Sequence, residues 1–242
     1  MDHARAGGIM SKGWIVFISI VVLVILALGF FGLFPGVSTL LGANKPKDLG
    51  VKYTQADLDA GRAMTGVSLQ EQPTVKSLTF DGSKSISGEY SDQTITAMIN
   101  GAKYKYYPLS NTQLRINPDG TVEASGVINI SKVGQWSLDL GAQEGLVAKA
   151  KSYIGIVSPS PSFYLKGAMS VTNNQISLNL TEAKVSRFTA PKSIIDQYQG
   201  PLADFVEERM ANVPGLQVRS AKFESGKLLL DANYPAVEKS AR

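Results

Sequence analysis

Hydrophobic and polar positions divide the chain into one long apolar run and a body in which they alternate. The run covers residues 14–34, WIVFISIVVLVILALGFFGLF, and its only polar side chain is the hydroxyl of Ser19. A helix of this length would extend about 31 Å, which matches the hydrocarbon core of a bilayer. Pro35 and Gly36 follow directly and would end the helix. The pattern therefore predicts a single transmembrane helix.

The charges that flank this run favour neither orientation, because a few basic residues lie on each side of it. A first hydrophobic segment usually acts as the export signal, so we expect the bulk of the chain to be extracytoplasmic. The alternative is a signal peptide cleaved after Ala43, although such peptides usually have an apolar region of only 7–15 residues. The predicted organisation is a cytoplasmic tail (1–13), a transmembrane helix (14–34), a tether (35–50) and an extracytoplasmic α+β domain (51–242).

Four segments of the body share a pattern of strand, turn and strand. In each of them, apolar and polar residues alternate on both sides of a turn that contains Gly or Asn, which is typical of a β-hairpin. In the second segment, Pro118, Asp119 and Gly120 supply the turn. The four predicted hairpins are residues 77–90, 112–130, 163–185 and 216–234.

Helix signals lie before and between these hairpins. Thr54 and Asp57 have the spacing of a capping box, and Gly66 can end the helix that they begin. Ser91 can cap a second helix, which Gly101 would end. Two further helices are predicted at residues 141–155 and 191–213.

The last of these segments has the strongest helical period in the body. Gly200 and Pro201 lie in its middle, which predicts either a kink or two separate helices. Its apolar stripe consists of Ile194, Ile195, Tyr198, Leu202, Phe205, Val206 and Met210. The predicted fold class is α+β, in which a largely antiparallel sheet of hairpins packs its apolar face on this one long amphipathic helix.

Composition excludes most of the familiar catalytic chemistry. The chain has no cysteine and one histidine, His3, near its start. Serine and cysteine triads need an imidazole base, and most zinc and haem sites need histidine or thiolate ligands. The net charge of +4 is not gathered into the basic face that nucleic acid would need. We therefore expect no enzymatic activity, no metal or other cofactor, and no nucleic-acid partner.

The order of elements over residues 75–235 and two motifs, SNTQLRINPDGTVEASG and VPGLQVRSAKFESGKLLL, suggest a family. In these features the chain resembles the TULIP-like lipid-binding proteins of bacterial envelopes, which are small membrane-anchored proteins or lipoproteins. The resemblance implies a curved antiparallel sheet that wraps a long helix and encloses an apolar groove for acyl chains. It implies no catalytic residues. Lipoprotein members carry an N-terminal cysteine, whereas this chain has the predicted transmembrane helix instead.

The leading hypothesis is a membrane-anchored extracytoplasmic module that binds membrane lipid or another apolar ligand and holds or transfers it near the bilayer. The apolar stripe of residues 194–210 is then the candidate groove. The alternative is that the stripe is solid core and that the domain is a non-enzymatic interaction or scaffold subunit, with another envelope protein as its partner. A charge at Leu202 or Phe205 would abolish ligand binding in the first case and unfold the domain in the second.

Overall fold

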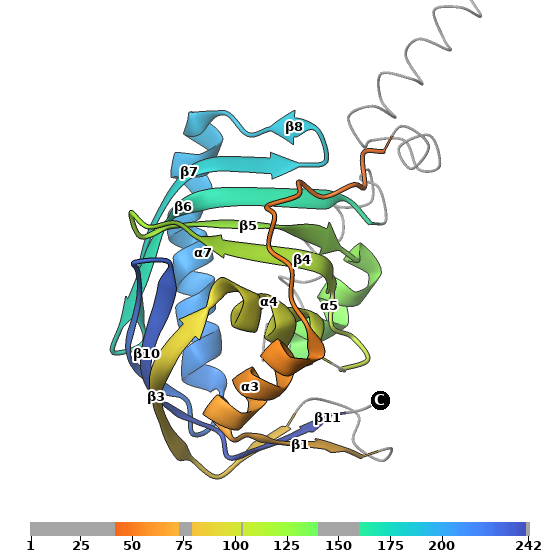
Figure 1. Ribbon diagram of the computed structural model, residues 1–242. Helices are drawn as coiled ribbons and strands as arrows, with labels where there is room; N and C mark the ends of the chain where they lie inside the picture. Colours follow the sequence, from red (N-terminus) through yellow and green to blue (C-terminus); the bar gives the residue numbers. More distant parts are fainter. Residues whose placement is uncertain (1–41, 73–78, 103, 140–159, 241–242) are drawn as a thin grey trace, which may run out of the picture.

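The computed structural model describes residues 42–72, 79–102, 104–139 and 160–240, which form an α+β domain (Figure 1). The elements are α3 (Gln55–Thr65), β1 (Ser68–Glu71), β2 (Thr79–Asp81), β3 (Lys84–Ser91), α4 (Asp92–Asn100), β4 (Leu109–Ile116), β5 (Thr121–Ile128), α5 (Ile130–Asp139), β6 (Ser162–Thr172), β7 (Gln175–Val185), β8 (Phe188–Thr189), α7 (Lys192–Asn212), β9 (Gln217–Glu224), β10 (Lys227–Tyr234) and β11 (Val237–Ser240). The predicted α+β class, with a mostly antiparallel sheet, is confirmed for this region.

Two predicted helices, at residues 14–34 and 141–155, lie outside the described residues. Among the helices within those residues, none combines the length and the apolar character that a bilayer crossing requires.

The large sheet is built around the long β6–β7 hairpin. One edge of β6 pairs with β7, while its other edge pairs first with β5 and then with β9. The β4–β5 and β9–β10 hairpins therefore share one edge of β6, and their turns meet. Gly120 has a φ of +82°, and a Cβ there would lie 2.7 Å from the backbone oxygen of Phe223. Only glycine suits this close approach between the two turns.

Three of the four predicted hairpins are confirmed, as β4–β5, β6–β7 and β9–β10. The prediction of a hairpin at 77–90 is wrong, because β2 and β3 lie in different sheets. β3 pairs with β10, whereas β2 pairs with β11 in a small sheet that β1 completes. The physical reason is burial: β3 places Ile86, 4% exposed, opposite the fully buried Ala232 of β10.

The predicted caps account for the starts of two helices. The Thr54 hydroxyl accepts a hydrogen bond from the Asp57 backbone, the Asp57 carboxylate accepts one from Thr54 N, and Gly66 ends α3 with a φ of +57°. The Ser91 hydroxyl accepts from Thr94 N at the start of α4. Segment 191–213 forms the single helix α7 with Pro201 inside it, so the two-helix alternative is wrong.

Alternation along the β6–β7 hairpin gives the sheet two faces of opposite character. Tyr164 lies opposite Lys184 on the polar face, and Met169 lies opposite Leu178 on the apolar face. Figure 1 shows α7 behind the strands and the chain around residues 42–51, in orange, in front of them. The polar face therefore meets the start of the domain, and the apolar face meets α7.

Helix side chains also form hydrogen bonds with the backbone of two edge strands, β4 and β7. On β4, the Thr96 hydroxyl and the Asn100 amide of α4 hydrogen-bond to the backbone of Leu114 and Thr112, at 2.7 to 3.3 Å. On β7, the backbone amides of Ile176 and Leu180 donate to Glu207 and Gln199 of α7, at 2.6 and 3.1 Å. These contacts replace strand neighbours and fix the position of α7 along β7.

The packed core occupies only one end of the apolar face. Its buried residues are Ile86, Val171, Val218, Ala221 and Ala232, and Met210 of α7 packs against them. Further along β6 and β7, the apolar side chains are only half-buried, and the series ends at Val185, which is 48% exposed. Burial therefore falls along the face from Val171 to Val185.

Candidate functional site

The seven residues of the predicted stripe lie on α7 in two different environments. Ile195 is buried, and Met210 packs against the core. Phe205 and Val206 are half-buried. The remaining three are exposed, by 42% at Ile194, 58% at Tyr198 and 41% at Leu202. The stripe is thus core at Met210 and buried at Ile195, whereas Ile194, Tyr198 and Leu202 stay open to solvent.

Exposed apolar side chains also occur on the strands beside the start of α7. The α7 contacts at Gln199 and Glu207 place the start of this helix beside the last residues of β7. Val185 at that end of β7 and Phe188 of β8 are 48% and 52% exposed. We call this surface the open end and define it by the exposed apolar residues Val185, Phe188, Ile194, Tyr198 and Leu202. Exposed apolar side chains that gather at one end of a sheet and its helix are typical of a binding site.

The opposite, polar face of the sheet is crossed by residues 42–51, which we call the strap. Its Leu49 amide donates to the Gln113 side chain at 2.7 Å, and Ser162 donates to the backbone oxygen of Ala43 at 2.9 Å. Leu49 and Val51 form a small buried cluster with Tyr164. Residues 42–50 of the predicted tether therefore lie against the sheet.

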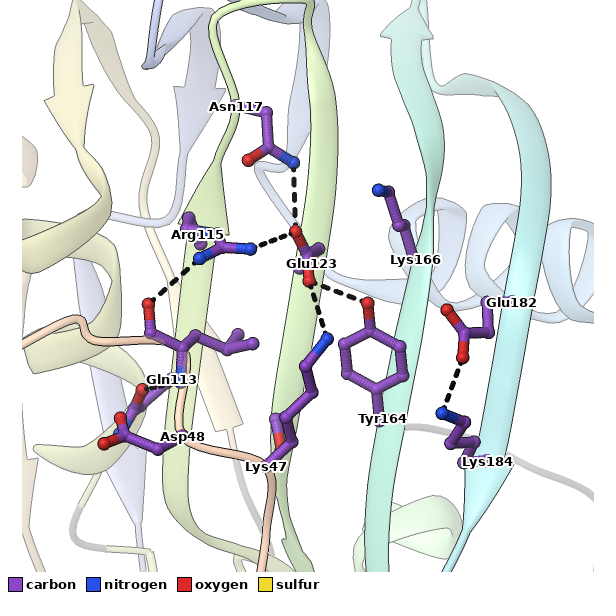
Figure 2. A network of polar contacts seen from close by, with 12 residues as sticks. Lys47, Asp48, Gln113, Arg115, Asn117, Glu123, Tyr164, Lys166, Glu182 and Lys184 are labelled. Carbon is purple, nitrogen blue, oxygen red and sulfur yellow. Dashed lines mark hydrogen bonds and ion pairs between the residues drawn. The ribbon is translucent and has the colours of Figure 1, made fainter. Parts of the chain in front are cut away.

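Glu123 lies at the centre of the contact between strap and sheet (Figure 2). Its side chain is 4% exposed, and it pairs with Arg115 on the neighbouring strand β4. It also accepts hydrogen bonds from the Tyr164 hydroxyl at 2.7 Å, Lys47 of the strap at 3.2 Å and Asn117 at 3.3 Å. We call these five side chains the clamp.

Electrostatics keep Glu123, Arg115 and Lys47 of the clamp charged at neutral pH. Burial acts to raise the pKa of Glu123, but the hydrogen bonds from Arg115, Tyr164, Asn117 and Lys47 outweigh it and lower the pKa to about 2. Burial, together with the neighbouring carboxylate, raises the pKa of Tyr164. The pKa of Lys47 is also raised, first by Tyr164 and then by Glu123. The clamp therefore stabilises the strap position and offers no group that titrates near neutrality.

A cavity of about 210 Å³ opens next to the clamp, between the strap and the start of β6. The Lys47 ammonium lies 3.9 Å from the centre of the Tyr164 ring, and that of Lys184 lies 5.6 Å from it. The described residues that line this cavity are Lys45, Pro46, Lys47, Ser162, Phe163, Tyr164, Lys184 and Ser186. We call it the lysine cavity.

The sequence pattern did not identify the clamp or the lysine cavity. One signal was available, because counting outward from the turn at Pro118 to Gly120 places Arg115 opposite Glu123 across the β4–β5 hairpin. Lys47 and Tyr164 join them only through contacts 76 and 41 residues away from Glu123 in the chain. Those contacts depend on the strap path and strand order, which local alternation does not encode.

Within the described ranges, no group of three or more histidine, cysteine, aspartate or glutamate residues is placed to hold a metal ion. Comparison of the chain with protein-family models, with curated proteins and with solved structures finds no match. The resemblance to TULIP-like proteins therefore stays a prediction, and function is inferred from the open end, the clamp and the lysine cavity themselves.

Proposed function

We propose that the protein is a membrane-anchored module whose extracytoplasmic domain binds a lipid or another apolar ligand near the bilayer. The observation that carries this proposal is the fall in burial along the apolar face, from 7% exposure at Val171 to 48% at Val185. A ligand that covers this surface gains about 0.8 kcal/mol for each CH₂ group removed from water. Binding of this kind needs only burial, without a cofactor or bond chemistry.

The position of the open end supports a ligand taken from the bilayer. Gly42, where the strap begins, lies beside Arg187 between β7 and β8, with its Cβ position 3.7 Å from the guanidinium. Seven residues, 35–41, separate Gly42 from the end of the predicted transmembrane helix. Even fully extended, this stretch spans only roughly 25 Å. The open end of the sheet therefore lies within reach of the bilayer surface.

The clamp gives the strap a role in this proposal. Because Glu123 joins the strap to β4, β5 and β6, the chain leaves the sheet at a fixed place next to the open end. A strap fixed in this way limits how the domain can rotate relative to its predicted anchor. We propose that the clamp keeps the open end directed towards the bilayer.

The test uses the full chain in its membrane, with a phospholipid that carries a photoreactive group in its acyl chain. Besides the predicted anchor, we expect cross-linked peptides from β6, β7 and the first half of α7. Leu202→Glu should strongly reduce these domain cross-links, because it places a charge on the open end. Gln197→Glu, at an exposed polar position of the same helix, adds the same charge and should leave them unchanged.

Fold measurements decide whether Leu202 lies on a binding surface or in the core. Leu202→Glu should retain the circular dichroism and thermal transition of the natural chain, whereas Met210→Glu, next to the core cluster, should unfold the domain. If Leu202→Glu unfolds the domain, or if the domain forms no lipid cross-links, the apolar-ligand proposal fails and the scaffold alternative is favoured.

A further inference from the structure

The lysine cavity lies at the same end of the β6–β7 hairpin as the open end, but on the polar face. Ser162 and Tyr164 of β6 line the cavity, together with Lys184 and Ser186. The apolar side chains of Phe163 and Val185 form a facing pair at the same level of the hairpin. The polar cavity and the open apolar face are thus two sides of one end of the sheet.

Positive charge exceeds negative charge around this cavity. Its described lining contains three lysines and no acidic residue. Lys184 is paired with Glu182 at 2.7 Å, and Lys47 shares the single carboxylate of Glu123 with Arg115. No carboxylate among the described residues forms an ion pair with Lys45. The positive charge of the cavity lining is therefore only partly neutralised by nearby carboxylates.

One residue of the cavity lining, Ser186, carries a hydroxyl without a partner. The Ser186 hydroxyl is buried and makes no hydrogen bond to any described residue, although its backbone amide donates to Ser162 O at 2.6 Å. A buried hydroxyl without a partner is uncommon, because its desolvation is not compensated. Ser186 also has a positive φ of 53°, a strained conformation that holds this turn beside the cavity.

We infer that the lysine cavity binds a phosphate group, carried either by an anionic lipid at the bilayer surface or by a soluble phosphate compound. Lys45, Lys47 and Lys184 supply ammonium donors, and Ser186 lies in the same lining. Phosphate oxygens accept several such charge-assisted hydrogen bonds at once. In its lipid form, this inference rests on the proposed function and adds to it a preference for anionic headgroups.

The test measures ligand binding to the detergent-solubilised full chain by native mass spectrometry. Three probes are compared: phosphatidylglycerol, diacylglycerol with the same acyl chains, and inorganic phosphate. The pocket variant is Lys45→Gln with Lys184→Gln, which leaves the clamp residue Lys47 in place. The matched control, Lys52→Gln with Lys222→Gln, removes the same charge from two exposed lysines outside the cavity.

We expect the pocket variant to bind phosphatidylglycerol about 30-fold more weakly, and diacylglycerol as well as the natural chain does. The control variant should keep both affinities. Binding of inorganic phosphate that the pocket variant alone loses also supports the cavity and identifies a soluble source as sufficient. If the two double variants lose phosphatidylglycerol affinity equally, or if neither loses any for either phosphate probe, the inference is wrong.

The same measurement separates this inference from the proposed function. Phosphate binding that depends on Lys45 and Lys184, without any binding of diacylglycerol by the natural chain, supports the cavity and contradicts the apolar-ligand proposal. Binding of diacylglycerol, with no preference for phosphatidylglycerol and no binding of inorganic phosphate, supports the open end as a lipid site and contradicts the phosphate cavity.

Discussion

The two faces of the large sheet combine burial and polarity in opposite ways. On β5, the polar residues Glu123 and Ser125 are buried beneath the strap, whereas the apolar residues Val122 and Ala124 on the other face are only half-buried. Sheets with one solvated face usually bury the apolar side and leave the polar side in water. Here the strap covers the polar side and is held there by hydrogen bonds, whereas the apolar side is only half-buried over much of its length.

This difference indicates distinct roles for the two faces. A buried carboxylate loses its hydration, so Glu123 is tolerated only because four side chains donate to it or pair with it. Such contacts depend strongly on geometry and select one position of the strap. Apolar contacts are less directional, so the opposite face can accept ligands of different shapes. Under the proposed function, the polar face positions the strap and the apolar face binds the ligand.

The largest expected effect comes from loss of the Glu123 charge. Glu123→Gln leaves Arg115 and Lys47 without their carboxylate, and we expect the free energy of unfolding to fall by about 3 kcal/mol. This value lies at the low end for a broken buried ion pair, because Arg115 and Lys47 are 41% and 48% exposed and can regain hydration. Chemical denaturation of the full chain measures the change.

Hydrogen exchange locates the same effect. In Glu123→Gln, exchange should accelerate at the Leu49 amide, which donates to the Gln113 side chain next to the clamp. Glu89→Gln is the matched control, because Glu89 forms an exposed ion pair with Lys227 on the same sheet. If the two variants lose similar stability, the polar face under the strap is no more important than the uncovered surface.

Acid should remove the contribution of Glu123 over a defined range. The pKa of this carboxyl is about 2 in the folded protein, below its ordinary value of 4.5, so the unfolded chain takes up the proton first. Its stabilisation is therefore complete above pH 4.5 and is lost as the pH falls towards 2. The difference in unfolding free energy between the natural chain and Glu123→Gln should shrink across this window. A difference that does not vary with pH contradicts the role of the carboxylate charge.

On the apolar face, the size of the removed side chain should matter less than its position. Val171→Ala removes contacts in the packed core and should cost about 2 kcal/mol. Leu180→Ala removes a larger side chain from the half-buried part and should cost only about 1 kcal/mol, because little packing is lost. Denaturant titration of both variants measures whether the smaller side chain contributes more to stability than the larger one. The open-face interpretation is wrong if Leu180→Ala costs more than Val171→Ala.

Much of the local structure was predictable from the sequence, because its causes lie within a few residues. Thr54 with Asp57, Ser91, and the turn at Pro118 to Gly120 each determine their backbone through neighbouring groups. Helix α5 was missed because Ile130 continues the alternation of β5, although the helix begins there. The Asn129 side chain marks this change, since it accepts from both the amide and the hydroxyl of Ser131.

The pairing of β3 and the composition of the clamp depend on long-range contacts. β3 could not be separated from β2 by alternation, since its partner β10 lies more than 130 residues further along the chain. The helical period predicted the apolar stripe on α7 but not the split between Tyr198, which is exposed, and Met210, which packs in the core. That split depends on how far the core extends, and period alone carries no such information.

The smallest expected effect lies where the polar face has no cover. Arg219 pairs with Asp231 and also donates to Asn233 and Ser85, but the paired side chains are 36% and 47% exposed. The pKa of Asp231 is lowered by this guanidinium, as that of Glu123 is lowered by Arg115. Asp231→Asn should nevertheless change the unfolding midpoint very little, because water screens and replaces an exposed ion pair.

The two carboxylate variants together measure the effect of the strap. Glu123 and Asp231 each pair with an arginine on a neighbouring strand of the same sheet. The strap covers only Glu123. Comparing Glu123→Gln with Asp231→Asn therefore sets a carboxylate–arginine pair covered by the strap, with Lys47 and Tyr164 as further partners, against an uncovered pair. If Asp231→Asn is as destabilising as Glu123→Gln, the arginine pairing itself stabilises the sheet, and the strap adds nothing to it. If only Glu123→Gln is destabilising, the stabilisation comes from covering the pair, and the strap is part of the folded domain.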